Sequence, residues 1–154
     1  MTAIETVYGS NWPFEKGFEV TLRDPKKAYS QRKNLTTLRY LGTSGKIVAE
    51  LKFVFWQKML TFSHDADLWN THFRAIFPNT DTNKTVQELR STGYDHLEKI
   101  RSLRNRIAHH EPIFRRNIQD EYDRIREVIF WTDVTAAGWV DKIETVTGMI
   151  ATKP

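Results

Sequence analysis

Apolar side chains recur at intervals of three and four residues over much of the chain, which is the spacing of a buried face on an α-helix. The pattern predicts helices over residues 47–62 and 82–110 and a final pair over residues 118–131 and 134–150. Pro112 should end the long second helix, because the residue before a proline is disfavoured in helical geometry.

Two shorter helices are expected ahead of the long one. Residues 29–41 fit a short helix that is followed by a glycine-containing turn. Residues 68–77 fit a second short helix, with Asp67 as its N-cap and Pro78 marking its end. The pattern therefore predicts an all-α bundle of about five helices after residue 45, preceded by the short helix over residues 29–41.

The first 28 residues contain two glycines and two prolines and are expected to be irregular. A short alternation of apolar and polar residues at Phe18, Val20 and Leu22 hints at a strand. We therefore expect an irregular N-terminal segment with one short helix over residues 1–45, and a helical domain over residues 46–154.

Composition narrows the class of protein. The 154 residues include no cysteine, which excludes disulfides, thiol catalysis and cysteine-based zinc sites. No run approaches the roughly 18 apolar residues of a membrane span, and the first residues lack a signal-peptide pattern. These features predict a cytoplasmic protein that neither spans nor binds a membrane.

Positive charge is concentrated in one stretch. The formal net charge of the chain is +4, yet residues 99–116 alone carry six basic residues against one acid, Glu111. Such a local excess suits RNA binding, although a solvated face is the usual fate of a charge run. The candidate RNA-binding residues, apart from Arg104, are Lys99, Arg101, Arg106, Arg115 and Arg116.

The same stretch holds the candidate chemistry. Arg104 lies about 40° from the centre of the apolar stripe of the long helix. A charge in that position must be paired or line a cleft, and Glu111 is a plausible partner if the last helical turn persists. His109 lies about 140° around the helix from Arg104, so the two side chains meet only if the helix distorts or a symmetric dimer forms.

The two adjacent histidines can serve different purposes. Imidazole exchanges its proton near neutral pH, as a general acid or base must. His109 is the better candidate, whereas His110 lies nearer the apolar stripe and is expected to orient or pack. A metal site built from these histidines and Glu111 is disfavoured, because adjacent residues point to different faces of a helix. No cofactor is expected.

These residues carry a resemblance to a known family. The string Leu-Arg-Asn-Arg-Ile-Ala-His-His-Glu-Pro at residues 103–112 resembles the signature of Abi-like (abortive infection) proteins, and its arginine-to-histidine spacing matches the HEPN motif. Upstream, residues 48–56 and 68–78 resemble that family's other characteristic segments. The similarity covers about residues 46–115.

The resemblance implies an HEPN-like helical domain that dimerises and cuts RNA without a metal. In that scheme Arg104 stabilises charge on the phosphate, His109 moves the proton, and Asn105 orients the cleft through hydrogen bonds, with His110 and Glu111 as possible supporting residues. It also implies a role in phage defence or as a toxin, with a possible antitoxin or regulatory partner.

Two other functions remain open at the level of sequence. The domain could be a non-catalytic HEPN module that binds RNA or serves as a dimerisation scaffold. Abi-like proteins usually carry additional helices before the segment that starts here near Ile47, and their absence from the pattern favours this alternative. A DNA-binding helical regulator has only the basic patch in its favour, because no helix-turn-helix pattern precedes the basic helix.

Overall fold

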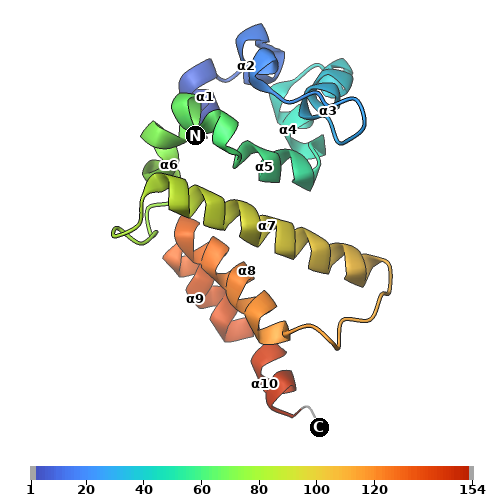
Figure 1. Cartoon of the computed structure of the whole chain (residues 1–154), viewed down its shortest axis with the longest axis vertical. Coiled ribbons are helices and arrows are strands. Elements are labelled where there is room, and N and C mark those ends of the chain that lie inside the picture. Colours follow the sequence, from blue (N-terminus) through green and yellow to red (C-terminus); the bar gives the residue numbers. More distant parts are fainter. Residues whose placement is uncertain (1–2, 153–154) are drawn as a thin grey trace. The chain divides into compact units, whose positions relative to one another are not determined.

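The structure is a computed structural model that describes residues 3–152. Over these residues the chain forms ten α-helices and several short turns of 3-10 or π helix, with no β-strand (Figure 1). The all-α prediction is confirmed, but there are more helices than the five expected. The chain divides into two compact units, residues 1–76 and 77–154, whereas the sequence pattern placed a boundary after residue 45.

The first unit is built from six short helices. They are α1 (Ala3–Tyr8), α2 (Lys16–Thr21), α3 (Gln31–Leu38), α4 (Ser44–Glu50), α5 (Phe53–Met59) and α6 (Asn70–Ile76). Aromatic rings form much of its core: the Trp12 ring centre lies 4.9 Å from that of Phe18 and 6.4 Å from that of Phe55. All three residues are buried.

The expected irregular segment is helical, and its hint of a strand was wrong. Residues 16–21 form α2. Phe18 in this helix and Leu22, which caps its end, are four residues apart and both buried. Val20 between them is 57% exposed. Three apolar residues at alternate positions therefore satisfied a strand pattern, although only two of them share the buried face.

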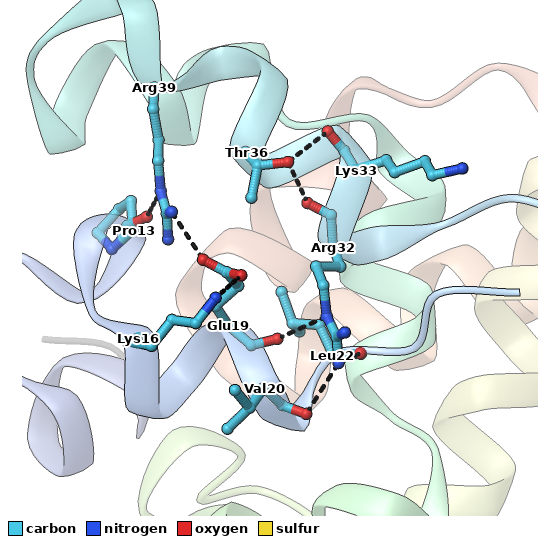
Figure 2. Close-up of polar contacts among 9 residues, drawn as sticks. All are labelled: Pro13, Lys16, Glu19, Val20, Leu22, Arg32, Lys33, Thr36 and Arg39. Atoms are coloured by element: carbon cyan, nitrogen blue, oxygen red, sulfur yellow. Dashed lines mark hydrogen bonds and ion pairs between the residues drawn. The ribbon is translucent and has the colours of Figure 1, made fainter.

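A polar network joins α2 to α3 and to the turn that follows it (Figure 2). The Glu19 carboxylate pairs with Lys16 and, at 2.7 Å, with Arg39, and these two cations lower the pKa of Glu19. The Arg32 guanidinium donates hydrogen bonds of 3.1 to 3.2 Å to the carbonyls of Glu19, Val20 and Leu22. Arg32 thus binds backbone carbonyls at the C-terminal end of α2, including that of Glu19, which also accepts a 3.2 Å hydrogen bond from the Leu22 N–H.

The helix expected over residues 47–62 is broken into α4 and α5 by extended backbone at Leu51 and Lys52. The buried residues Ile47, Leu51, Phe55 and Met59 follow one another at intervals of four. That spacing drifts by about 40° per step around a straight helix, so one continuous helix turns its later members away from the core. The break allows all four to be buried.

The segment between α5 and α6 also differs from its prediction. Asp67 is not an N-cap but lies inside a π-helical turn, Asp65–Trp69, that leads into α6. Phe62, the last residue of the helix expected over residues 47–62, is 68% exposed and lies under the guanidinium of Arg23. His64 is 1% exposed, and its Nε2 atom has no hydrogen-bond partner among the residues that the structure describes.

The second unit is built around the long helix that the sequence predicted. It contains α7 (Val86–Ala108), α8 (Ile118–Thr132), α9 (Val134–Ile143) and α10 (Val146–Ala151). Helix α8 packs against both α7 and α9 and runs antiparallel to α9 (Figure 1). The helix expected over residues 134–150 is split at residues 144–145, where the Glu144 side chain accepts a hydrogen bond from the Thr147 backbone N–H and caps α10.

Polar contacts set the register of α8 against its neighbours. Arg126 on α8 donates two hydrogen bonds of 2.6 Å to Asp141 on α9, and this pairing lowers the pKa of Asp141. On the other side of α8, His96 of α7 lies 2.8 Å from Glu127. The start of α8 therefore lies near the end of α9, and the loop that joins α7 to α8 is at this end of the unit.

Burial of His64 makes the stability of the protein depend on pH. Burial lowers the pKa of this histidine below its ordinary 6.5, so the unfolded chain binds the proton more readily than the folded chain. Stability from this group is complete above that pH and falls as the pH drops below it, by up to about 1.4 kcal/mol per pH unit. Urea unfolding of the wild type and His64→Gln between about pH 7 and about pH 5 tests this, with a flatter profile expected for the variant.

His72→Gln is the matched control, because His72 is only half-buried. Its pH profile should follow that of the wild type. Parallel profiles for the wild type and His64→Gln would contradict the assignment.

Candidate functional site

The candidate site, residues 104–111, lies at the C-terminal end of α7. A capping box begins the same helix at Thr85. The Thr85 hydroxyl accepts a hydrogen bond from the Glu88 backbone N–H, and the Glu88 carboxylate accepts one of 2.8 Å from the Thr85 N–H. This reciprocal pair satisfies two of the backbone donors that a helix start leaves free. The helix then runs for 23 residues, shorter at both ends than the predicted 82–110.

The last turn of α7 closes in a Schellman motif. The His110 N–H donates to the Ile107 carbonyl at 3.1 Å, and the Glu111 N–H donates to the Arg106 carbonyl at 2.8 Å. His110 adopts the left-handed backbone conformation that this motif requires, with φ at 54°, and it is the only non-glycine residue over residues 3–152 with a positive φ. The position usually holds glycine, and a residue with a Cβ costs about 1–2 kcal/mol there.

The Schellman motif reverses the direction of the backbone after His109, and this reversal changes the ion-pair partner of Glu111. The sequence paired Glu111 with Arg104 on the assumption of a continuous helix, but Glu111 lies beyond the turn and its Oε2 is 3.1 Å from Nε of Arg106. The ion pair joins the two positions that a Schellman motif often links by a hydrophobic contact. The expected Arg104–Glu111 pair is therefore wrong. His110 is exposed, so it does not pack near the apolar stripe, which was one of the two roles expected for it.

Asn105 contacts the two residues proposed for chemistry. Its side-chain oxygen accepts a 3.3 Å hydrogen bond from Nη1 of Arg104, and its backbone carbonyl accepts a 3.0 Å hydrogen bond from the His109 N–H. His109 is the C-cap of α7, with φ at −98° and ψ at 12°. Arg104, Asn105 and His109 therefore form a connected group at the helix end.

Arg104 and His109 are both exposed. No hydrogen bond or ion pair joins their side chains, and neither side chain pairs with a carboxylate of the residues that the structure describes. The sequence argued that Arg104 must be paired or line a cleft because it lies near the apolar stripe. Exposure to water removes that requirement and leaves the guanidinium available to an external anion.

Carboxylates neutralise half of the basic residues in the motif region. Arg101 pairs with Glu98, Arg106 with Glu111 and Arg116 with the buried Glu121. Among the described residues, this leaves Lys99, Arg104 and Arg115 without a carboxylate partner, so the local positive field is weaker than the sequence count implies. The three-residue spacing of Glu98 and Arg101 on a helix was a signal that sequence reasoning missed.

Arg104 and His109 do not border three hollows found in the described part of the protein. One of about 490 Å³ is bordered by residues such as Arg23 and Gln31, and one of about 610 Å³ by residues such as Trp139. The third, of about 430 Å³, lies beside residues 25–38. Arg104 and His109 lie instead at an exposed helix end.

Aromatic residues of both units make hydrogen bonds within the fold. Trp69 and Phe73 are buried, and Trp69 Nε1 donates a 2.6 Å hydrogen bond to the Met59 carbonyl. The Tyr122 hydroxyl lies 3.3 Å from Asp141 as part of the α8–α9 contact.

The described residues contain neither a metal-binding group nor a helix that could cross a membrane. Residues 3–152 contain no group of three or more histidine, aspartate or glutamate side chains placed to hold a metal ion. Within the same range no helix combines the length and the hydropathy needed to cross a membrane.

Comparisons with known proteins give no relative. The sequence matches no protein-family model, and searches of curated proteins and of solved structures found no similar protein. The function is therefore argued from the residues at the end of α7.

The left-handed backbone at His110 gives a stability prediction. His110→Gly should raise the free energy of unfolding by about 0.5–1 kcal/mol, because relief of the strained conformation exceeds the entropic cost of glycine. His109→Gly, at the adjacent position with a negative φ, is the matched control and should lower stability by about 0.5–1 kcal/mol. Urea unfolding measures both, and a loss of stability in His110→Gly would contradict the backbone geometry.

Proposed function

We propose that this chain is an Abi-like, HEPN-type endoribonuclease that cleaves RNA without a metal, acting in phage defence or as a toxin. The observation that carries the proposal is the group at the end of α7. The Asn105 side chain accepts a hydrogen bond from Arg104, and its backbone carbonyl accepts one from the His109 N–H. Neither Arg104 nor His109 pairs with a carboxylate among the residues that the structure describes. A guanidinium, an amide and an imidazole at this spacing are what the HEPN motif supplies.

The chemistry needs only these protein groups. The ribose 2′-hydroxyl attacks the adjacent phosphorus, and the bond from phosphorus to the 5′-oxygen of the next nucleotide breaks. One imidazole accepts the proton of the attacking hydroxyl, and a protonated imidazole supplies a proton to the leaving oxygen. The products are a 2′,3′-cyclic phosphate and a free 5′-hydroxyl. Arg104 donates hydrogen bonds to the phosphate oxygens as negative charge develops on them.

Two copies of the chain suit this reaction better than one. It uses an acid and a base, and each chain offers one His109, at an exposed helix end that borders none of the three hollows described above. Exposed apolar side chains of the second unit, including Ile107, Ile143 and Met149, offer surface for association. A homodimer that brings two α7 ends together would supply both imidazoles and a groove for RNA.

Charge supports RNA as the partner. Lys99 and Arg115 join Arg104 as cations without carboxylate partners among the described residues, and we propose that they contact phosphates. Arg101, Arg106 and Arg116 retain donors beyond those used in their ion pairs and are proposed as secondary contacts. An antitoxin or regulatory protein that covers this basic end would control the activity.

One observation favours a second candidate, a non-catalytic HEPN module that binds RNA or serves as a dimerisation scaffold. Among the described residues no hydrogen bond or ion pair joins the side chains of Arg104 and His109, and both residues are exposed. Phosphate binding needs only exposed cations, whereas catalysis needs both residues held at the same phosphodiester.

Cleavage of RNA in EDTA separates the two candidates. The wild type should cut total RNA with the chelator present, and Arg104→Ala and His109→Ala should each lower the rate at least about 100-fold, because each removes a group that acts in the transition state. The products should carry 2′,3′-cyclic phosphate ends. His72→Ala is the matched control and should cleave as the wild type does.

Thermal unfolding of each variant must match the wild type for the comparison to hold. Equal cleavage by all variants would refute the site. RNA binding without cleavage by the wild type would favour the non-catalytic module.

Association is tested by light scattering. The wild type should have about twice the 18.1 kDa mass of one chain. Ile143→Glu places a charge on the exposed apolar surface of the second unit and should favour the monomer, with a parallel loss of cleavage. Val20→Glu, at a position 57% exposed in the first unit, is the matched control. A strictly monomeric wild type that still cleaves would contradict the two-copy site.

A further inference from the structure

The loop between α7 and α8 presents an aromatic ring beside the motif. Phe114 and Arg115 form the centre of a turn that is closed by a 2.9 Å hydrogen bond from the Arg116 N–H to the Ile113 carbonyl. Phe114 is 61% exposed at this turn, whereas Ile113 before it is half-buried. The turn therefore directs the larger apolar side chain toward solvent and the smaller one toward the protein.

Ion pairs hold this loop at both ends. Glu111 pairs with Arg106 at the end of α7, and Arg116 donates a 2.8 Å hydrogen bond to the buried Glu121 in the first turn of α8. Between them Pro112 has a fixed φ. A loop restrained in this way presents Phe114 in a defined place, so little conformational entropy is lost when the ring meets a ligand.

Arg115 places a cation next to the ring. Its Cζ atom lies 5.7 Å from the centre of the Phe114 ring, within the range of a cation–π contact. An aromatic ring with a guanidinium over one of its faces matches the two parts of a nucleotide, because a base stacks on the opposite face while the cation contacts the phosphate.

We propose that Phe114 and Arg115 form a stacking platform that selects RNA with an unpaired nucleotide next to the cleaved bond. The inference rests on the proposed ribonuclease function and names its substrate class as single-stranded RNA. A base in a duplex is already stacked and paired, so it cannot lie on an external ring without being extruded at a cost in free energy. Stacking also tolerates every base, so the platform selects strandedness rather than sequence.

The platform lies within reach of the motif. Phe114 follows His109 by five positions, so their Cα atoms are at most about 18 Å apart even in fully extended chain. A single strand that places its phosphate at Arg104 and His109 needs only a few nucleotides to reach the ring. Phe114 is therefore a specificity-determining residue in this proposal and not a catalytic one.

The first unit contains a matched pair that serves as a control. Phe62 is 68% exposed, and the Cζ atom of Arg23 lies 5.5 Å from the centre of its ring. The chemistry of the two pairs is the same, but Phe62 lies outside the loop and the basic stretch that hold the motif. Phe62→Ala therefore removes an equivalent aromatic group without touching the proposed platform.

Binding is measured without cleavage on a 2′-O-methylated oligoribonucleotide that carries 2-aminopurine, both as a single strand and annealed to its complement. We expect the single strand to bind the wild type with quenching of the fluorescent base. Phe114→Ala should bind it about 5- to 150-fold more weakly and without quenching. Phe114→Trp should retain both properties, Phe62→Ala should match the wild type, and duplex binding should change little in any variant.

The outcomes separate this inference from the nuclease proposal, which unmodified RNA tests in parallel. Wild-type affinity and quenching in Phe114→Ala would overturn the platform, even if His109→Ala has lost cleavage. An equal loss of duplex and single-strand binding in Phe114→Ala would also overturn it. A platform supported by these probes in a protein that cleaves nothing would refute only the catalytic function. No RNA binding by the wild type would overturn both.

Discussion

The reversal of the backbone at the end of α7 is the constraint on which the candidate site depends. Two hydrogen bonds from His110 and Glu111 back to the last helical turn end the helix and turn the chain away from its axis. Because of this reversal His109 becomes a cap residue, Glu111 pairs with Arg106, and Arg104 is left without a carboxylate partner within residues 3–152. A helix two residues longer would have given Glu111 a different neighbour and a different candidate site.

Ion pairing decides which basic residues near the end of α7 keep a positive charge that is not neutralised by a carboxylate. Three arginines are held by Glu98, Glu111 and Glu121, and the last two of these ion pairs also fix the loop between α7 and α8. The paired arginines thereby act mainly on structure, and the remaining cations are the ones available to phosphate. The same loop carries the exposed Phe114, so the anchors, the free cations and the aromatic ring belong to one continuous segment.

The first unit is stabilised by contacts between its short helices rather than by one long helix. Its helices are short, and short helices contribute little stability on their own. Their ends are joined by side chains from elsewhere, as Arg32 and Arg39 do for the segment around Glu19 (Figure 2). Buried aromatic contacts around Trp12 and Phe55 supply the core. Helices of six to eight residues span only about two turns, so their apolar residues form no long periodic pattern. This is why residues 1–28 appeared irregular in the sequence.

Sequence alone determined the helical class, the long helix that carries the motif, and α8, because these elements have apolar periodicity over several turns. It also identified the arginine, asparagine and histidine that the structure connects at one helix end. Only the tertiary structure decided where helices break, as at Leu51 and Glu144, and which acid pairs with which base. The physical reason is that periodicity reports which face of a regular helix is buried. Breaks, reversals and ion pairs depend on neighbours that are brought together only when the chain has folded.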